Sequence, residues 1–197
     1  MTTSNSKIEP ESDGRRQRTE RSRTAIIEAS LSLLEEGILV PTAQQISDRA
    51  GVGIRTFFRH FEDMNTLFEA VDDSIRSHYE TLILTGDRNG SLEERIDHAV
   101  DRHAAVYEQV ANVILSAAAQ RWRYDVLRKN YARSQRGLRK DLDNLLPEIK
   151  DLPQSTREAI DAIASFELWN RLREHQGQSK RSTISIVSSL LKTLITH

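Results

Sequence analysis

The 197-residue sequence contains no cysteine, and this absence excludes disulfide bonds, thiolate metal sites and cysteine nucleophiles. Long apolar runs are also missing, so no segment reaches the length that spans a bilayer. The first residues are polar and of mixed charge, without the apolar core of a signal peptide. We therefore expect a cytoplasmic protein that has no membrane partner.

A large excess of charge of one sign is missing as well. The chain has 28 Lys and Arg residues against 29 Asp and Glu residues, which gives a formal net charge of −1. A protein of this balance lacks a general affinity for nucleic acid, so DNA binding would have to come from a local basic face, with the acidic residues concentrated elsewhere. A glycine-rich phosphate loop, a Cys/His metal-ligand set and a nucleophile elbow are also missing from the sequence.

Residues 42–61 have the pattern of two short helices joined by a tight glycine turn. Thr42 can accept a hydrogen bond from the free N–H groups that open a helix, and Ile46 and Ala50 lie one turn apart on its inner face. Gly51 adopts a left-handed conformation without a side-chain clash, so it can end the first helix and turn the chain. This pattern predicts a helix-turn-helix, whose second helix enters the DNA major groove.

The second helix of this pair has an apolar side and a basic side. Phe57 and Phe61 lie one turn apart and are expected to face inward. Arg55 and Arg59 are also one turn apart, and two guanidinium groups on an exposed face suit contacts to guanine O6 and N7 or to phosphate. A solvated surface helix is the alternative interpretation of these two arginines. The outward and flanking faces carry Ile54, Arg55, Thr56, Phe58, Arg59 and His60.

Together these features resemble the amino-terminal domain of TetR-family transcriptional regulators, over roughly residues 20 to 70. The resemblance rests on an apolar first helix at 27–34 that ends at Gly37, a second helix started by Thr42, an Ala-Gly-Val turn at 50–52, an aromatic recognition helix that closes on His-Phe at 57–61, and Leu67 beyond it. It implies an all-helical protein that binds double-stranded DNA. By this resemblance, phosphates are contacted by Thr42, Thr56 and His60, and base edges are faced by Ile54, Arg55, Phe58 and Arg59.

Two departures from the family pattern remove contacts to the DNA backbone. Phe58 stands where the family usually has a tyrosine, and Met64 stands where a lysine usually begins the following helix. We expect the lost affinity to come from a basic run ahead of the helix-turn-helix. A solvated, disordered tail is the alternative interpretation of this run. The run consists of Arg15, Arg16, Arg18, Arg21 and Arg23.

Composition and periodicity divide the chain into three parts. Residues 1–14 are polar and are expected to be disordered, residues 15–63 form the helix-turn-helix domain, and residues 64–197 form a helical domain for ligand binding and dimerisation. About nine helices are expected in all. The first begins at about Thr19 and ends at Gly37, and a longer helix over residues 63–84 connects the domains before the break at 86–90.

Helix starts in the second domain are indicated by two capping-box patterns. Ser91 is followed three residues later by Glu94, and Ser155 is followed by Glu158. The second of these patterns predicts a helix that continues to Gly177. A last helix is expected from about Ser182.

The two carboxy-terminal helices have more apolar surface than helices over a small core need. The resemblance implies that they pack against their copies in a second subunit as a four-helix bundle, which gives a twofold homodimer. The alternative is that they close the core of the monomer itself. The residues expected at the dimer interface are Ile160, Ile163, Leu172, Ile184, Val187, Leu191 and Leu194.

Polar and aromatic residues within the apolar helices of the second domain are candidates for contacts to a ligand. A pocket lined by aromatic side chains and few charged ones would suit a mainly apolar or aromatic small molecule, oriented by one or two hydrogen bonds. Aromatic residues at helical spacing are also common in protein cores, which is the alternative interpretation. The candidates are His103, Tyr107, Trp122, Phe166 and Trp169, with Tyr124 nearby in sequence.

Acidic and histidine residues of one predicted helix are the candidates for a catalytic site. His98 and Asp101 share a face at a spacing that suits an acid-base pair or a metal. His98 and His103 diverge around the helix, however, and the second Glu-x-x-His pattern that a di-iron bundle needs is missing. We therefore expect neither catalytic residues, nor a metal, nor a cofactor.

The sequence thus predicts an all-helical, two-domain, homodimeric transcriptional regulator. Two recognition helices must lie roughly 34 to 36 Å apart to enter successive major grooves, so the operator should be palindromic. We expect a repressor, because occupancy alone blocks a promoter. A ligand would release it by favouring a different spacing, with the helix over residues 63–84 as the lever. The alternatives are a helical module that binds an acidic protein and a small helical enzyme that uses His98 and Asp101.

Overall fold

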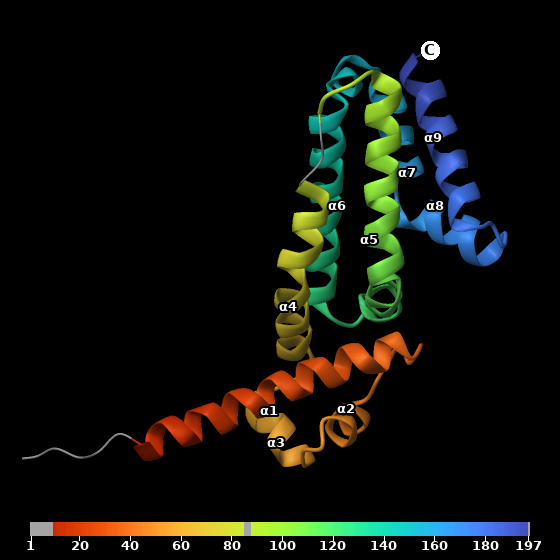
Figure 1. Cartoon of the computed structure of the whole chain (residues 1–197). Helices are drawn as coiled ribbons and strands as arrows, with labels where there is room; N and C mark the ends of the chain where they lie inside the picture. Colours follow the sequence, from red (N-terminus) through yellow and green to blue (C-terminus); the bar gives the residue numbers. More distant parts are fainter. Residues whose placement is uncertain (1–9, 85–87, 197) are drawn as a thin grey trace, which may run out of the picture. The chain divides into compact units, whose positions relative to one another are not determined.

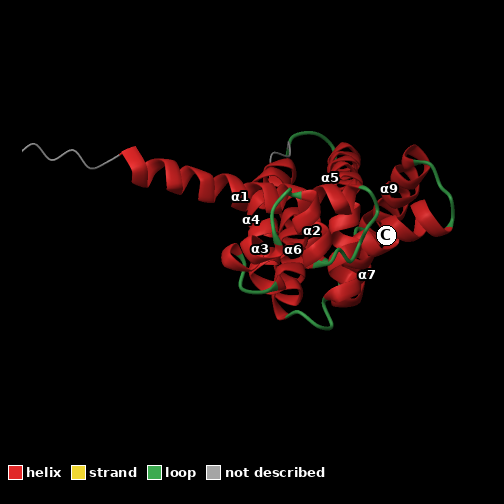
Figure 2. Cartoon of the chain, turned by 90° about the horizontal axis from the view of Figure 1, so that it is seen from below, coloured by secondary structure: helices red, strands yellow, loops and turns green. Residues whose placement is uncertain are grey.

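The computed structural model describes residues 10–84 and 88–196. Within these residues the chain forms nine α-helices, one short 3-10 segment and one short π-helical segment, and Figure 2 shows that loops alone connect them. The all-helical fold predicted from the sequence is therefore confirmed. The chain forms two compact units, Met1–Ser74 and Ile75–His197, and each is described by itself.

Unit 1 is built from four helices around one apolar core. They are α1 (Pro10–Glu35), α2 (Ala43–Arg49), α3 (Ile54–His60) and the first half of α4 (Met64–Leu84), all labelled in Figure 1. Helices of seven residues are marginal in water, so α2 and α3 depend on burying their apolar sides. The buried core consists of Ile26, Ile27, Ala29, Leu33, Ile46, Phe57, Phe61, Leu67, Ala70 and Val71.

The first helix is longer than its composition predicted. It begins at Pro10 rather than at about Thr19, so residues 10–14 are helical although disorder was expected there. Proline suits the first turn of a helix because the N–H that it lacks would have no partner within the helix. Residues 1–9, the remainder of the predicted tail, lie outside the described residues. The domain boundary after residue 63 stays a prediction, whereas the division into compact units falls inside α4.

Unit 2 contains the second half of α4 and the remaining helices. They are α5 (Leu92–Gln120), α6 (Asp125–Leu145), the 3-10 segment η1 (Pro147–Asp151), α7 (Gln154–Ile163), α8 (Phe166–Asn170), the π-helical segment η2 (Arg171–His175) and α9 (Lys180–Thr196). The long helix α5 packs against both α6 and α9 (Figure 1). The main core holds Ile96, Leu142, Leu146, Ile160 and Leu191, and a smaller cluster holds Ala104, Tyr107, Phe166 and Trp169.

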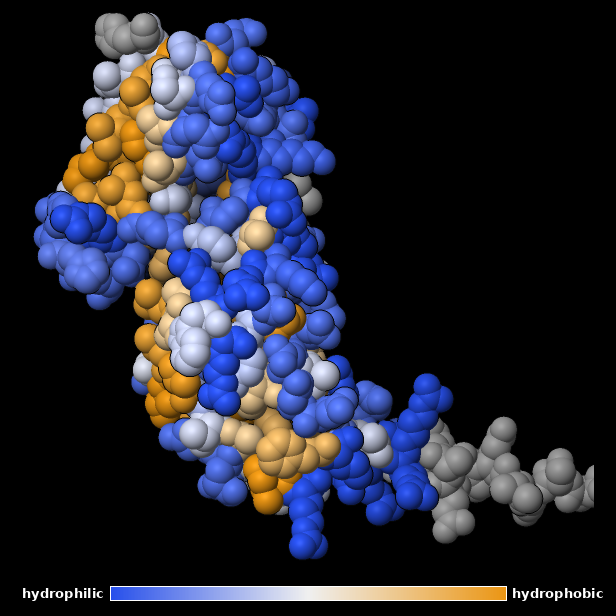
Figure 3. Space-filling model, turned by 180° about the vertical axis from the view of Figure 1, so that it is seen from behind, coloured by the Kyte–Doolittle hydropathy of each residue, from blue (hydrophilic) through white to orange (hydrophobic). Residues whose placement is uncertain are grey.

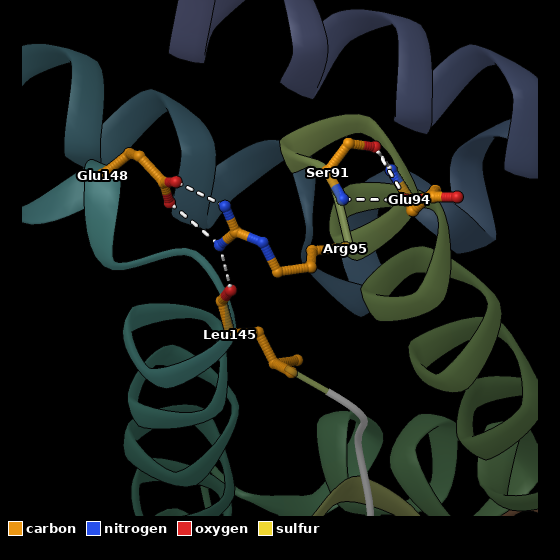
Figure 4. A network of polar contacts seen from close by, with 5 residues as sticks. All are labelled: Ser91, Glu94, Arg95, Leu145 and Glu148. Carbon is orange, nitrogen blue, oxygen red and sulfur yellow. Dashed lines mark hydrogen bonds and ion pairs between the residues drawn. The ribbon is translucent and has the colours of Figure 1, made fainter. Parts of the chain in front are cut away.

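The start of α5 is fixed by local and long-range hydrogen bonds (Figure 4). The predicted capping box is confirmed, because the Ser91 backbone N–H donates to Glu94 Oε2 at 2.8 Å and the Ser91 hydroxyl accepts from the Glu94 N–H at 3.3 Å. One turn on, Arg95 Nη1 donates to the Leu145 carbonyl at 2.7 Å, and its guanidinium also pairs with Glu148. These contacts join the first turn of α5 to the end of α6.

The helix predicted to run from Ser155 to Gly177 is interrupted in the structure. Helix α7 starts after Pro153, which has no capping side chain, so the predicted capping box of Ser155 and Glu158 is wrong. Glu158 instead bonds Arg139 of α6 at 2.7 Å. The chain breaks at Ala164, and the Ser165 hydroxyl caps α8 by accepting from the Leu168 N–H. The last helix begins at Lys180, two residues before the predicted start.

Candidate DNA-binding interface

The turn between α2 and α3 has the geometry that the sequence predicted. Thr42 caps α2, because its hydroxyl accepts from the Gln45 N–H at 3.2 Å while Gln45 Oε1 accepts from the Thr42 N–H at 2.9 Å. Gly51 has a φ of 66°, in the left-handed region where other residues are strained. The chain can therefore reverse within three residues and start α3 after Gly53.

Two aromatic residues fix α3 against the core of unit 1. Phe57 is fully buried and Phe61 is 1% exposed, with their ring centroids 5.9 Å apart. The guanidinium carbon of Arg23 lies 5.3 Å from the centroid of the Phe61 ring, within the range of a cation–π contact. The inward positions of both rings, which their spacing predicted, leave the opposite side of α3 to solvent.

An ion pair that no local sequence pattern predicts holds α2 against α1. Arg49 Nη1 and Nη2 donate to the two carboxylate oxygens of Glu36 at 2.6 and 2.7 Å, and Nη1 also donates to the Ser32 hydroxyl at 2.7 Å. The hydrogen bonds from Arg49 lower the pKa of Glu36. No local pattern links Arg49 to Glu36, which lies thirteen residues earlier, so only the fold reveals this pair.

The exposed face of α3 contains the predicted reading residues. Arg55, Phe58 and Arg59 are exposed, and Phe58 keeps 51% of its surface accessible. Neither arginine side chain forms an ion pair or hydrogen bond with any residue that the structure describes. Two unpaired guanidinium groups one turn apart beside an accessible aromatic ring present donors and an apolar surface together. Major-groove base edges offer the matching acceptors and thymine methyl groups.

The remaining predicted contacts on this unit are less accessible or already engaged. Ile54, Thr56 and His60 are half-buried, and Nε2 of His60 is buried without a partner among the described residues. Burial, followed by the charges of Arg59 and Arg23, lowers the pKa of His60. Thr42 is exposed, but its hydroxyl also donates to Gln45 Oε1 at 2.9 Å. Phosphate contacts from Thr42, Thr56 and His60 stay predictions.

The basic run lies along α1 and is helical, which excludes its interpretation as a disordered tail. Its members Arg15, Arg16, Arg18, Arg21 and Arg23 are all exposed. The surrounding charge differs from the expectation, however. Residues 1–74 contain nine Lys and Arg residues against thirteen Asp and Glu residues, so the unit of the helix-turn-helix itself has an acidic excess and the acidic residues are not concentrated elsewhere.

Three of the five predicted ligand residues line one small cavity in unit 2. His103, Tyr107 and Trp169 surround about 10 Å³, which is room for one water molecule. The Tyr107 hydroxyl donates to the Ala164 carbonyl at 2.7 Å, and Phe166 packs edge-on against the Tyr107 ring. Trp122 is 77% exposed on the turn after α5, so its assignment to the pocket is wrong. In this conformation the aromatic cluster is a closed core.

The predicted dimer-interface residues divide into two groups. Ile160, Leu172, Val187 and Leu191 are at most 5% exposed within the core of unit 2, so their assignment to an intersubunit surface is wrong. The alternative interpretation, that they close the monomer's own core, describes them correctly. The second group is only partly buried and stays predicted, and it consists of Ile163, Ile184 and Leu194.

The residues of the catalytic alternative do not form a site. His98 and Asp101 are both exposed on α5, and the neighbouring Asp97 accepts from Lys192 Nζ at 2.9 Å. Across residues 10–84 and 88–196, no group of three or more acidic or histidine side chains is placed to hold a metal ion. In the same part of the chain, every helix is too short or too polar to cross a membrane.

Comparison with known proteins agrees with this geometry. Residues 26–71 match the family model of bacterial regulatory proteins of the tetR family. The HTH-type transcriptional regulator BetI of Escherichia coli O17:K52:H18 (strain UMN026 / ExPEC) is 31% identical over 158 residues, which cover 76% of this chain and 80% of that protein.

Solved structures extend the likeness of fold to most of the chain. A transcriptional regulator from Rhodococcus sp. Rha1 has a TM-score of 0.67 at 14% identity, with 90% of this chain and 96% of that chain covered. A TetR transcriptional regulator from Rhodococcus sp. RHA1 has a TM-score of 0.52 at 17% identity, with 89% and 96% covered. With the reading geometry of α3 and the BetI relationship, the conclusion is that this chain belongs to the TetR family of transcriptional regulators, which bind DNA and are not enzymes.

Proposed function

We propose that this regulator binds a palindromic operator as a homodimer, represses transcription from it in the cytoplasm, and is released by a small molecule bound in unit 2. The observation that carries the proposal is the pair of exposed, unpaired guanidinium groups of Arg55 and Arg59, one turn apart on α3. A protein surface that keeps two like charges together without counter-charges favours an anionic or acceptor-rich partner.

The contacts divide into base reading and backbone positioning. On this proposal Arg55 and Arg59 donate to guanine O6 and N7, while Phe58 and the partly buried Ile54 contact thymine methyl groups; the exposure of Arg55, Phe58 and Arg59 supports this assignment. The α1 arginines, together with Thr42, Thr56 and His60, are proposed to contact phosphates. Because unit 1 has a net excess of acidic residues, the operator must be held by these few local cations.

A second subunit is proposed to cover an apolar stripe on α9. Ile186, Leu190 and Leu194 recur every four residues and therefore lie on one side of the helix. Leu190 is 40% exposed, and the other two are only partly buried against the core. Figure 3 shows apolar surface gathered on the α9 side of unit 2. Packing this stripe with the partly buried Ile163 against a second copy removes it from water.

Ligand release requires unit 2 to adopt a second conformation. The cavity beside His103, Tyr107 and Trp169 has room only for water, so an apolar or aromatic ligand must displace the aromatic cluster to enter. The ligand shifts the equilibrium by the difference in its affinity for the open and closed states. Helix α4 passes from one unit to the other, and we propose that it transmits this change to the spacing of the recognition helices.

Selection of bound fragments from random duplex DNA with the purified protein tests this function. We expect an inverted repeat whose half-sites are centred one helical turn, about 34 to 36 Å, apart. Enrichment of a single non-repeated half-site would contradict the dimer, and a failure to enrich any sequence would contradict operator binding. Binding of a fluorescent duplex that carries the selected site, repeated across a library of aromatic small molecules, then tests release.

A charged residue on the α9 stripe tests the proposed interface. Leu190→Glu should convert the dimer to a monomer in analytical ultracentrifugation, because the carboxylate would be buried without a partner. Ser189→Glu is the matched control, since it adds the same charge to the neighbouring exposed position off the stripe. An unchanged dimer in Leu190→Glu, or an equal loss in both variants, would exclude this face as the interface.

A further inference from the structure

Helix α6 has a strongly basic face. Residues 126–140 include six Lys and Arg residues and not one Asp or Glu. Three of the basic residues are paired or bonded within the unit, because Arg128 bonds Asp125, Arg133 donates to Asn130 at 3.0 Å, and Arg139 bonds Glu158. The other three, Lys129, Arg136 and Lys140, are named here the α6 stripe.

The α6 stripe is continuous along one side of the helix. Its members are separated by seven and four residues, so at 3.6 residues per turn they lie within about 40° of one another around the axis. They extend over roughly 16 Å of helix. All three are exposed, and their side chains form no ion pair or hydrogen bond with the portions of the chain that are described.

The surroundings of the stripe identify the chemistry of its partner. The exposed positions of α6 are Asp125, Arg128, Lys129, Arg136, Gly137 and Lys140, so large apolar side chains are absent from the exposed part of this helix. Figure 3, which views unit 2 from the side of α6, shows a predominantly hydrophilic surface there. A helix that inserts into a lipid surface needs apolar residues beside its cations, which disfavours a membrane as the partner.

Charge distribution between the units favours duplex DNA as the partner. Residues 75–197 contain nineteen Lys and Arg residues against sixteen Asp and Glu residues, whereas unit 1 has the opposite imbalance. A protein of a DNA-binding family encounters the high local concentration of phosphates along a duplex. Each phosphate that a protein cation neutralises releases condensed counterions, and this release favours binding. A regulator whose reading unit is acidic gains affinity from cations placed outside that unit.

We propose that the α6 stripe binds the phosphate backbone of duplex DNA without sequence preference, as a contact additional to the operator reading by α3. The inference rests on the proposed function only in taking DNA as the polyanion. On this proposal Lys129, Arg136 and Lys140 increase the affinity for DNA of any sequence, whereas Arg55 and Arg59 determine the sequence preference.

The test compares two charge-matched triple variants of the full chain. Lys129→Gln, Arg136→Gln and Lys140→Gln remove the stripe, while Lys150→Gln, Lys180→Gln and Arg181→Gln remove the same charge from exposed positions elsewhere in unit 2. Binding to a 40-base-pair duplex of random sequence is titrated by fluorescence anisotropy at several salt concentrations. All substituted side chains are exposed, so equal melting curves are expected and confirm that both proteins are folded.

The expected result is a change in salt dependence specific to the stripe. Its removal should make the slope of log affinity against log salt shallower by between about 2 and 3, while the control variant keeps the wild-type slope. Equal slopes in all three proteins would overturn the proposal. Loss of binding to phosphatidylserine vesicles, with the slope on DNA unchanged, would also overturn it by assigning the stripe to lipid.

The outcome is separable from that of the proposed function. Arg55→Ala, measured with the same random duplex and the selected site, tests sequence preference and leaves the stripe intact. If the wild-type protein prefers no sequence but the stripe variant still changes the slope, operator reading fails and the stripe contact stands. If the wild-type protein prefers a sequence but the stripe variant keeps the wild-type slope, operator reading stands and the stripe contact fails.

Discussion

Two sets of arginines, one within unit 2 and one on α3 of unit 1, differ in what their guanidinium groups contact. In unit 2, Arg95, Arg102 and Arg173 each pair with a carboxylate on another element, at Glu148, Asp141 and Glu108. On α3 of unit 1, Arg55 and Arg59 meet no partner among the described residues. A paired guanidinium holds two helices together, whereas an unpaired one is available to a ligand. The same residue type therefore stabilises the fold where it is paired and is available to a partner where it is not.

The ion pair with the most buried carboxylate should give the largest effect when its arginine is removed. Arg102 Nη2 donates to Asp141 Oδ2 at 2.7 Å, with 15% and 6% of the two side chains exposed. Arg102→Ala would leave the Asp141 carboxylate buried beside His103 without its guanidinium partner. We expect unit 2 to lose about 3 to 5 kcal/mol of unfolding free energy, measured by urea denaturation followed by tryptophan fluorescence.

Replacement of both partners sharpens this prediction. Arg102→Met combined with Asp141→Leu removes the charges together, so much of the lost stability should return. Operator binding should change in proportion to folding in both proteins. If Arg102→Ala alone were as stable as the wild type, the ion pair would make no net contribution to the unfolding free energy of unit 2. The claim that paired arginines stabilise the fold would then be contradicted.

The unpaired arginines should give the opposite pattern, with a loss of binding and no loss of stability. Arg55→Ala or Arg59→Ala should each weaken binding to the selected operator by roughly 1 to 3 kcal/mol if it reads a base. Arg139→Ala is the control, because its partner Glu158 is on unit 2. An equal loss on random duplex would assign the substituted arginine to the backbone. Unchanged binding in both variants would remove α3 from the interface.

Unit 1 could be predicted in detail because its signals are local. The cap at Thr42, the glycine turn at Gly51 and the inward positions of Phe57 and Phe61 each depend on residues within a few positions of one another. Residues 42–61 alone were therefore sufficient to predict a TetR-like recognition helix. The brace between Arg49 and Glu36 was not, because the two residues meet only after α1 and α2 have packed.

Unit 2 could be predicted only as a set of amphipathic helices. Apolar residues of α7 and α9 were visible, but whether each faces the core or a second subunit depends on how the helices are rotated in the fold, so Ile160 and Leu191 were assigned to the wrong surface. The break at Ala164 and Ser165 carries no glycine or proline that would signal it. Trp122 was assigned to a pocket from its residue type alone, and its position on a turn exposes it.

An arginine of intermediate character tests whether the contrast is gradual. Arg49 is paired with Glu36, but both side chains are exposed, at 36% and 52%, so solvent screens the pair. Arg49→Ala should lower the melting temperature of unit 1 by less than Arg102→Ala lowers that of unit 2. Operator affinity should fall slightly, since α2 positions α3. A double-mutant cycle with Glu36→Gln isolates the pair, and a coupling as large as that of Arg102 and Asp141 would contradict the distinction by burial.

The smallest expected effect separates the units by their response to acid. His60 is the only histidine among residues 1–74, and its pKa is lowered from 6.5 by burial and by the charges of Arg59 and Arg23. The unfolded chain therefore takes up this proton first as the pH falls below 6.5, and unit 1 loses stability between that pH and the folded pKa. Arginine contacts lower the pKa of Glu108 and Glu148 in unit 2, so their stabilisation is lost only below about pH 4.5.

Both tryptophans lie in unit 2, so their fluorescence follows that unit, while segment-resolved hydrogen exchange follows residues 43–61 of unit 1. Between pH 6.5 and 5, the protection factors of residues 43–61, which correct for the slower intrinsic exchange in acid, should fall modestly in the wild type and less in His60→Gln, which removes the titrating group. The same variant should leave the response of unit 2 unchanged. If protection of residues 43–61 depends equally on pH in both proteins, His60 is not the acid-sensitive group of unit 1. Its half-buried imidazole would then take up a proton as readily in the folded protein as in the unfolded chain.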